Sequence, residues 1–142
     1  MQQIQLNLFA DYFQFYIQDD DESVGDLSDA WTKEATDRLM AVSDRVIGVG
    51  TVRNMDVPVF IHVVDELPEL QTEDWDRLNK ASIECLTGRF VIAGCTDYLP
   101  DAKRIEVGPG TYDAIVGYKG LSSLSDDGLD GEDSYHLFLA PS

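Results

Sequence analysis

The stretch TYDAIVGY, residues 111–118, sets the pattern from which the fold class follows. Its apolar side chains recur at every second position, at Tyr112, Ala114, Val116 and Tyr118. Such alternation is typical of a β-strand with one buried face, because successive side chains of a strand point to opposite sides. The stretch is therefore predicted to be a strand of a half-buried sheet.

Similar short strands are predicted on both sides of this one, at intervals of roughly 8 to 12 residues. They cover residues 82–86, 90–95 and 104–107 before it and residues 135–139 after it. Glycines separate them, and Gly108-Pro109-Gly110 is interpreted as a hairpin turn that leads into the strand at 111–118. This spacing favours an antiparallel β-sandwich, because a single strong helix accompanies seven or eight strands.

The first half of the chain contributes the remaining strands. Residues 4–17 alternate but change phase, which fits either one long strand with a bulge near Ala10-Asp11 or two strands around a tight bend. Residues 46–52 and 57–64 are rich in β-branched side chains, and the four residues 53–56 between them predict a hairpin. Residues 57–64 are apolar on both faces apart from His62, as in a central strand.

One main α-helix is expected after the acidic run at residues 19–22. Trp31, Ala35, Leu39 and Val42 form an apolar stripe at helical spacing. Thr32 is placed to cap the amino end, and the helix is expected to stop near residues 43–44. Together these elements predict a single β-sandwich domain over residues 1–142, with surface connections at residues 65–76 and 122–134, the second of them mobile.

The net charge of −17, from 27 acidic and 10 basic side chains, excludes several classes of partner. Such a field repels phosphate backbones and anionic lipid, so neither nucleic acid nor a membrane surface is expected to bind directly. The sequence shows neither a cationic leader nor an apolar run long enough to span a bilayer. Cys85 and Cys95 lie in apolar stretches and are expected to be buried free thiols, so a cytoplasmic location is predicted.

The pattern of titratable residues predicts no catalytic centre, cofactor or metal. His62 and His136 each fall inside a predicted strand, where they are either half-buried structural residues or a catalytic pair that the fold brings together. Asp97 and Asp101 flank a turn and are interpreted as solvated residues rather than an acid–base pair. Residues 126–137 match a calcium loop in part, but Gly128 and Leu137 stand where ligands belong.

Several motifs resemble the competence protein J family, the inhibitors of the DNA-entry nuclease of competent bacteria. The resemblance is carried by Tyr12-Phe13-Gln14-Phe15, Trp31-Thr32, Glu34-Ala35, Arg53-Asn54 and Val59-Phe60-Ile61, and more weakly by Pro109-Gly110-Thr111-Tyr112. It covers residues 11–64 well and the rest of the chain poorly. The resemblance implies a small non-enzymatic protein that binds and blocks a nuclease.

A surface dense in carboxylates can occupy the cationic site of a nuclease, so a basic protein such as a nuclease is the expected partner. Charge density alone selects the candidate contact residues, which are Asp19, Asp20, Asp21, Glu22, Asp126, Asp127, Asp130, Glu132 and Asp133. An evenly solvated surface that serves solubility is the alternative. Two other functions stay open, an immunity protein against another toxin and a ligand-binding or enzymatic β-sandwich.

Overall fold

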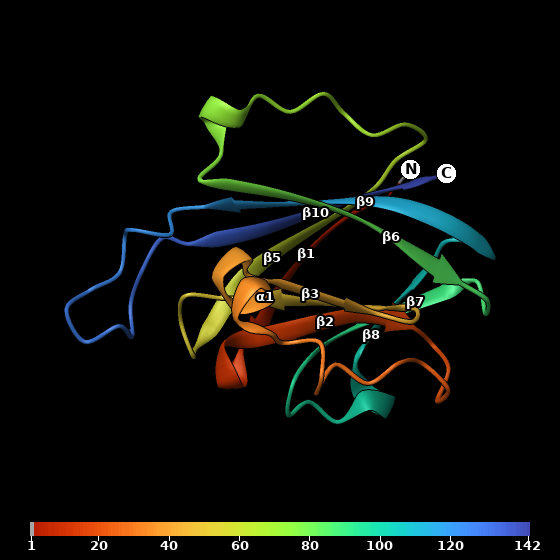
Figure 1. The fold of residues 1–142 in the computed structure, drawn as a ribbon, viewed down its shortest axis with the longest axis horizontal. Coiled ribbons are helices and arrows are strands. Elements are labelled where there is room, and N and C mark those ends of the chain that lie inside the picture. Colours follow the sequence, from red (N-terminus) through yellow and green to blue (C-terminus); the bar gives the residue numbers. More distant parts are fainter. Residues whose placement is uncertain (1) are drawn as a thin grey trace.

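The structure, a computed structural model, describes residues 2–142 and contains two five-stranded sheets packed face to face (Figure 1). Sheet A contains, in spatial order, β1 (Gln2–Phe9), β5 (Asp56–Val63), β10 (Ser134–Pro141), β9 (Gly110–Lys119) and β6 (Arg77–Cys85). Sheet B contains β3 (Met40–Ser43), β4 (Val46–Gly50), β2 (Gln14–Asp19), β7 (Arg89–Gly94) and β8 (Lys103–Glu106). The predicted β-sandwich is confirmed, with ten strands in place of seven or eight.

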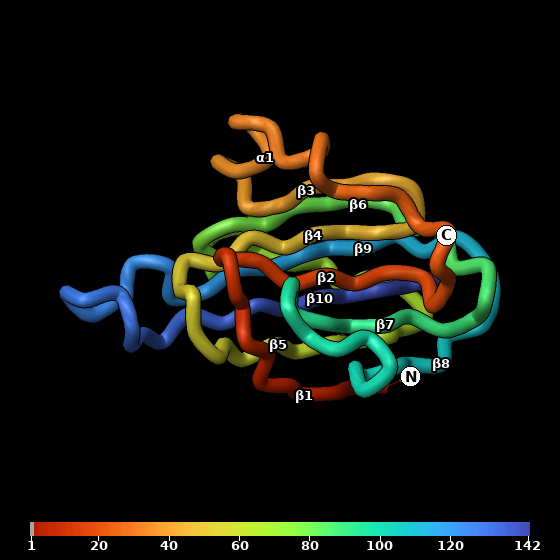
Figure 2. Tube along the Cα trace, turned by 90° about the horizontal axis from the view of Figure 1, so that it is seen from below, coloured from red at the N-terminus to blue at the C-terminus, as the bar shows by residue number. Residues whose placement is uncertain are grey.

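Strand pairing is antiparallel throughout except between β5 and β10, which run parallel. The strands of the two sheets lie nearly aligned when one sheet is viewed through the other (Figure 2), as in other aligned sandwiches. The predicted central strand is confirmed, because β5 lies between β1 and β10 with Val57, Val59 and Ile61 fully buried.

The core between the sheets is built from the inward-facing positions of both. Tyr135 of β10 meets Phe15 of β2 edge-to-face at 6.0 Å between ring centroids and Tyr118 of β9 at 5.9 Å. All three rings are fully buried. Each contributes on the order of 1.5–3 kcal/mol by leaving water, and their edge-to-face packing ties the two sheets together across the sandwich.

Residues 4–17 form two strands that belong to different sheets. A 3₁₀ turn at Asp11–Phe13 separates β1 of sheet A from β2 of sheet B. Of the two alternatives, the structure therefore has the bend and not the bulged strand. The chain reverses across the sandwich at this turn, and Tyr12 and Phe13 adopt positive φ angles of 58° and 60° to do so.

The hairpin predicted over residues 46–64 is wrong. β4 pairs with β2 and β3, whereas β5 pairs with β1 and β10, so residues 51–55 cross from one sheet to the other. Backbone bonds from Thr51 N to Phe13 O and from Ala10 N to Met55 O fix this crossing beside the β1–β2 turn. Both strands are apolar on both faces, so their pattern does not specify a partner.

The predicted hairpin turn at Gly108-Pro109-Gly110 is wrong for the same reason. It connects β8 of sheet B with β9 of sheet A, and Gly108 and Gly110 have the positive φ angles that this sharp crossing needs. A crossing between sheets uses the same turn residues as a hairpin, so composition does not distinguish the two.

Helix α1 (Lys33–Arg38) begins as predicted and ends early. The Thr32 hydroxyl accepts a hydrogen bond from Ala35 N, which confirms the cap. Leu39 then adopts a left-handed conformation with φ 64°, and its N–H donates to the carbonyls of Ala35 and Thr36. The expected end at residues 43–44 is wrong, because residues 40–43 form β3.

Two long connections complete the fold. Residues 64–76 pass over the outside of sheet A and include a 3₁₀ turn at Thr72–Asp74, and residues 120–133 project from one end of the sandwich (Figure 1). Both were predicted as surface loops. None of the helices in the described part of the chain is long and apolar enough to cross a membrane.

Candidate protein-interaction site

The two acidic clusters that the sequence singles out lie at opposite ends of the sandwich. Asp19 ends β2 next to the pair Gln18–Val46, whereas the loop at residues 120–133 is bonded to Arg53, beyond the other end of β4. The loop projects at the left in Figure 1, and the chain leaves β2 at the right. The clusters therefore form two separate surfaces.

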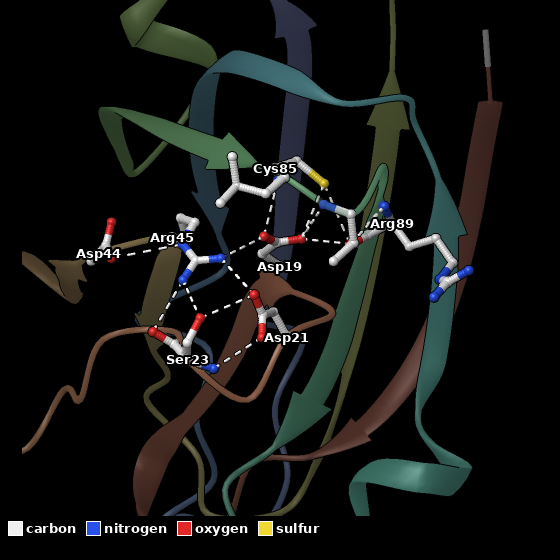
Figure 3. A network of polar contacts seen from close by, with 9 residues as sticks. Asp19, Asp21, Ser23, Asp44, Arg45, Cys85 and Arg89 are labelled. Atoms are coloured by element: carbon white, nitrogen blue, oxygen red, sulfur yellow. Dashed lines mark hydrogen bonds and ion pairs between the residues drawn. The ribbon is translucent and has the colours of Figure 1, made fainter.

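The first cluster is mostly a structural ion network (Figure 3). Asp19 is fully buried, and its carboxylate accepts hydrogen bonds from Arg45 Nη1 at 3.0 Å, Leu86 N at 2.9 Å and Thr87 Oγ1 at 2.6 Å. Burial alone would raise the pKa of Asp19, but these hydrogen bonds outweigh it and lower the pKa to about 2. The prediction that Asp19 contacts a partner is wrong, because no part of its side chain reaches the surface.

Arginines within the chain also engage the next two acids. Arg45 Nη1 lies 3.0 Å from Asp21 Oδ2, and its Nη2 donates to Ser23 Oγ at 2.6 Å. Asp20 Oδ2 is shared between Arg89 Nε at 3.1 Å and Arg104 Nε at 3.3 Å. Glu22 is exposed. Three arginines thus offset most of the charge of this run, so it offers little field to a basic partner.

A single buried ion pair anchors the second cluster. Asp133 is fully buried, with Oδ1 2.5 Å from Arg53 Nε and Oδ2 accepting from Tyr135 Oη at 2.7 Å. Tyr135 Oη in turn accepts from Val52 N at 2.9 Å, and Arg53 Nη1 donates to Leu129 O at 3.3 Å. Asp133 is therefore not available as a contact residue, and its prediction as one is wrong; it holds the acidic loop against residues 52–53 instead.

The other four acids of this cluster are exposed on the anchored loop. They are Asp126, Asp127, Asp130 and Glu132. Short bonds within the loop fix its backbone, including Ser125 Oγ to Asp127 Oδ1 at 2.6 Å and Glu132 N to Ser123 Oγ at 2.7 Å. The Ser125 hydroxyl and the Leu129 N–H lower the pKa of Asp127, so its charge is retained into mildly acidic solution.

Exposed apolar side chains gather beside this loop. Tyr12 is 68% exposed, Phe13 53% and Leu129 50%, and the side chain of Met55 is exposed as well. Hydrogen bonds join the three segments, since Phe13 N donates to Asn54 Oδ1, Ala10 N to Met55 O, and Arg53 Nη1 to Leu129 O. We call this surface the acidic end; it consists of Tyr12, Phe13, Met55, Asp126, Asp127, Leu129, Asp130 and Glu132.

The backbone at Tyr12 and Phe13, whose rings are both exposed, is strained. A left-handed conformation costs a residue with a Cβ roughly 1–2 kcal/mol, and here two such residues follow each other. Hydrogen bonds of the backbone at Ala10 and Phe13 hold the turn in place. None of these bonds involves the two exposed aromatic side chains. Strain of this kind occurs at binding surfaces, where a fixed geometry is needed.

The two histidines lie together on the outer face of sheet A, 6.5 Å apart between ring centroids. His136 stacks on Phe60 at 4.6 Å, His62 stacks on Phe138 at 4.5 Å, and Trp75 from the 64–76 connection covers His136 edge-on at 5.0 Å. Burial, and next the charge of Lys119, lower the pKa of His136 to about 4, and burial lowers that of His62. Both rings are therefore neutral at pH 7 and pack as half-buried structural residues.

His136 and Asp97 each make a local hydrogen bond, and the described residues hold no metal-binding cluster. His136 Nε2 bonds Ser134 Oγ at 2.9 Å, a partner that supplies no charge. Within residues 2–142, no group of three or more histidine, cysteine or acidic side chains is arranged to hold a metal ion. Asp97 Oδ2 accepts from Gly94 N at 2.7 Å, so it closes the turn after β7, and Asp101 is exposed.

The cysteines are free thiols at different depths. Cys85 is buried and Cys95 is half-buried, so the expectation of burial holds fully for the first. Burial and the nearby charge of Asp19 raise the pKa of Cys85 to about 11, which keeps this thiol protonated.

Comparison with known proteins shows likeness in fold. No family model and no curated protein sequence matches the chain. Among solved structures, the chain is similar to ComJ from Bacillus subtilis, an inhibitor of the DNA-degrading activity of NucA, with a TM-score of 0.68 and 16% identity over all of this chain and 96% of that one. It is also similar to crocagin biosynthetic gene J, with a TM-score of 0.60 and 16% identity over 99% of this chain and 96% of that one. The resemblance to the competence protein J family is thus confirmed at the level of the fold.

The apolar half of the acidic end was not selected from the sequence as a site. Tyr12 and Phe13 were noted for the resemblance alone, since an alternating strand gives no sign that two consecutive aromatic residues lie in a turn. The anchoring role of Asp19 and Asp133 did have a signal in the sequence, in Arg45 and Arg53. These arginines flank the largely apolar stretch 46–52, and an arginine that such a stretch carries into the fold needs a carboxylate partner there.

Proposed function

We propose that this chain is a non-catalytic inhibitor that binds a nuclease through the acidic end. The observation that carries the proposal is the exposed, strained Tyr12–Phe13 pair beside an acidic loop that Arg53 holds in place. The likeness of the fold to that of ComJ supports the class of partner. Since crocagin biosynthetic gene J has a similar fold, the proposal depends on the surface as well as on the fold.

The acidic end has the composition of a protein-binding surface. Protein interfaces have an apolar centre rich in aromatic residues and a polar rim. Here Tyr12, Phe13 and Met55 provide the apolar centre, and the loop with Asp126, Asp127 and Asp130 provides the charged rim. Aromatic side chains in fixed positions commonly contribute most of the binding free energy, because little conformational entropy is lost.

The charge of the rim points to a basic partner. A nuclease holds phosphates with cationic groups, and four anchored carboxylates present a similar charge to such a site. The proposed mechanism is steric and electrostatic: the loop occupies the groove that DNA would enter, and the aromatic pair holds it there. No chemical step is required of the chain, and its location in the cytoplasm is part of the proposal.

A DNA-cleavage assay tests the proposal. We would purify NucA and each DNA-degrading nuclease encoded in the genome of origin, and titrate the chain against the cleavage of plasmid DNA. Inhibition should be complete near one chain per nuclease. A rise in DNA concentration should not relieve it, whereas it would relieve inhibition by a weak competitor. If a tenfold molar excess inhibits none of these nucleases, the proposal is wrong; inhibition of a toxin of another kind would favour an immunity protein.

Two variants locate the surface. Replacing both aromatic residues, Tyr12→Ser with Phe13→Ser, should weaken inhibition by roughly a hundredfold or more, since loss of one central anchor costs at least about 2 kcal/mol. Leu86→Ser is the matched control, because Leu86 is also an exposed apolar residue but lies beside Asp19 at the other end. Equal effects of the two changes would contradict the proposed surface.

A further inference from the structure

The four sheet edges of the sandwich differ in how they are protected against pairing. An edge strand presents unpaired N–H and C=O groups, and natural proteins protect it with charges, with proline or by making it short. β3 and β8 have four residues each, and β8 also carries Lys103 and Arg104. β6 is long, but it carries Arg77, Lys80 and Glu84.

β1, the other edge of sheet A, has none of these protections. It is eight residues long, QQIQLNLF, with no charged residue and no proline. It pairs with β5 residue by residue from Gln2 to Phe9, so no bulge turns it away from a partner. Within residues 2–142, the backbone groups of residues 2–9 make no hydrogen bond outside the β1–β5 ladder. Figure 2 shows β1 along the lower edge of the sandwich.

The lack of charge in β1 indicates what pairs with it. The chain carries a net charge of −17, so most surfaces of two copies repel each other. β1 is a long uncharged segment at the surface, where two copies can meet without placing carboxylates opposite carboxylates. At the ends of β1, Asp56 pairs with Phe9, and the backbone carbonyl of Glu106 accepts a hydrogen bond from the Gln2 side-chain amide.

The pattern of β1 also complements itself. Gln3, Gln5 and Asn7 point outward, whereas Ile4 and Leu6 are half-buried against the core. In an antiparallel pair centred on Gln5, Ile4 lies opposite Leu6 of the partner subunit, and the outward amides lie opposite one another. This arrangement covers the half-buried apolar side chains, and the amides can bond across the interface.

We propose that two copies of this chain form a dimer by antiparallel pairing of β1 with β1, so that sheet A continues across the two-fold axis as ten strands. This inference goes beyond the proposed function, because it rests on the residues of β1, none of which belongs to the acidic end. It commits to a second copy; an extended segment of another protein is the alternative occupant.

Sedimentation equilibrium of the full chain tests the dimer. From about 10 µM to 1 mM, a range that covers weak association, the mass should rise from 15.8 kDa toward twice that value. Salt should strengthen the dimer, because screening reduces the repulsion between two acidic subunits. This is the opposite of the salt dependence expected for a basic partner, so the two proposals can fail separately. A monomer at every concentration and salt level would overturn the dimer.

Charge substitutions at Gln5 test the β1 interface. Gln5→Lys and Gln5→Glu each place like charges opposite each other in the pair, so each variant alone should remain monomeric. An equal mixture of the two should restore the dimer, which no general loss of folding can imitate. Ser82→Lys is the matched control, because Ser82 is exposed on β6, the other edge of sheet A. If Gln5→Lys stays as dimeric as Ser82→Lys, β1 is not the interface.

Discussion

The ion pair between Arg53 and Asp133 gives the sharpest prediction for stability. Asp133→Asn removes the negative charge but keeps an oxygen that accepts from Tyr135 Oη. The side chains of Arg53 and Asp133 are 10% and 0% exposed, so the relevant range is that of a buried pair broken on one side, about 3–5 kcal/mol. We expect the free energy of unfolding to fall by about 3 kcal/mol, which lowers the melting temperature by roughly 6–12 °C for a chain of this size.

Urea unfolding followed by tryptophan fluorescence measures this change, since Trp31 packs against β4 of sheet B and Trp75 against β10 of sheet A. Asp126→Asn on the same loop is the control and should change stability by less than about 0.5 kcal/mol, because Asp126 is exposed. The double variant Arg53→Met with Asp133→Asn should recover part of the loss, because no charge is then left buried without a partner. A loss below about 1 kcal/mol for Asp133→Asn, as for an exposed pair, would refute the anchoring role.

Three further predictions concern the outer face of sheet A and the acidic loop. The pKa of His136 is lower in the folded chain, about 4, than its ordinary value near 6.5, so the stability it contributes is complete above about pH 6.5 and is lost as the pH falls toward 4. The urea midpoint should therefore decrease less between pH 7 and pH 5 in His136→Phe than in the wild type; an unchanged dependence would contradict the burial of this ring. Gly117→Ala would place a Cβ 2.5 Å from Trp75, so it should displace the indole, shift its fluorescence and cost about 1–3 kcal/mol, whereas Gly128→Ala, with open space around it but a positive φ, should leave the indole in place. EDTA should leave the melting temperature unchanged, and a rise of several degrees in millimolar calcium would show that the acidic loop binds the ion.

The strands were predictable from the sequence where apolar side chains alternate with other residues. The alternation of Tyr112, Ala114, Val116 and Tyr118 marks β9 because all four face the core, although Ile115 and Gly117 on the outer face are buried as well. Strand partners were not predictable, because β4 and β5 are apolar on both faces and the link between them fits a hairpin as well as a crossing between sheets. The predicted helix was too long because the apolar spacing of residues 31–42 does not reveal that Leu39 adopts a left-handed conformation and ends the helix.

The acidic contact residues show a similar limit. Counting charges selects Asp19 and Asp133 as readily as Asp126, but only the fold brings Arg45 and Arg53 against the first two. Each arginine lies 26 or more positions away from its carboxylate along the chain. Local sequence patterns do not identify ion pairs at that separation. Acidic residues that anchor a loop therefore cannot be distinguished by sequence from those exposed for contact.

The association rate between the chain and a nuclease that it inhibits tests the central claim most directly. The acidic loop should speed association with a basic partner, and the effect should fade as salt rises and the Debye length falls below about 10 Å. The test variant neutralises the loop through Asp126→Asn, Asp127→Asn, Asp130→Asn and Glu132→Gln. The control removes the same number of exposed charges elsewhere, through Asp65→Asn, Glu66→Gln, Glu69→Gln and Glu84→Gln.

Stopped-flow measurements at low and high salt compare the two variants. The account predicts that the loop variant associates at least about tenfold more slowly than the wild type at low salt and loses most of its salt dependence, whereas the control stays within about twofold of the wild type. Equal rates for the two variants, or a rate for the wild type that salt does not change, would contradict binding through the acidic end.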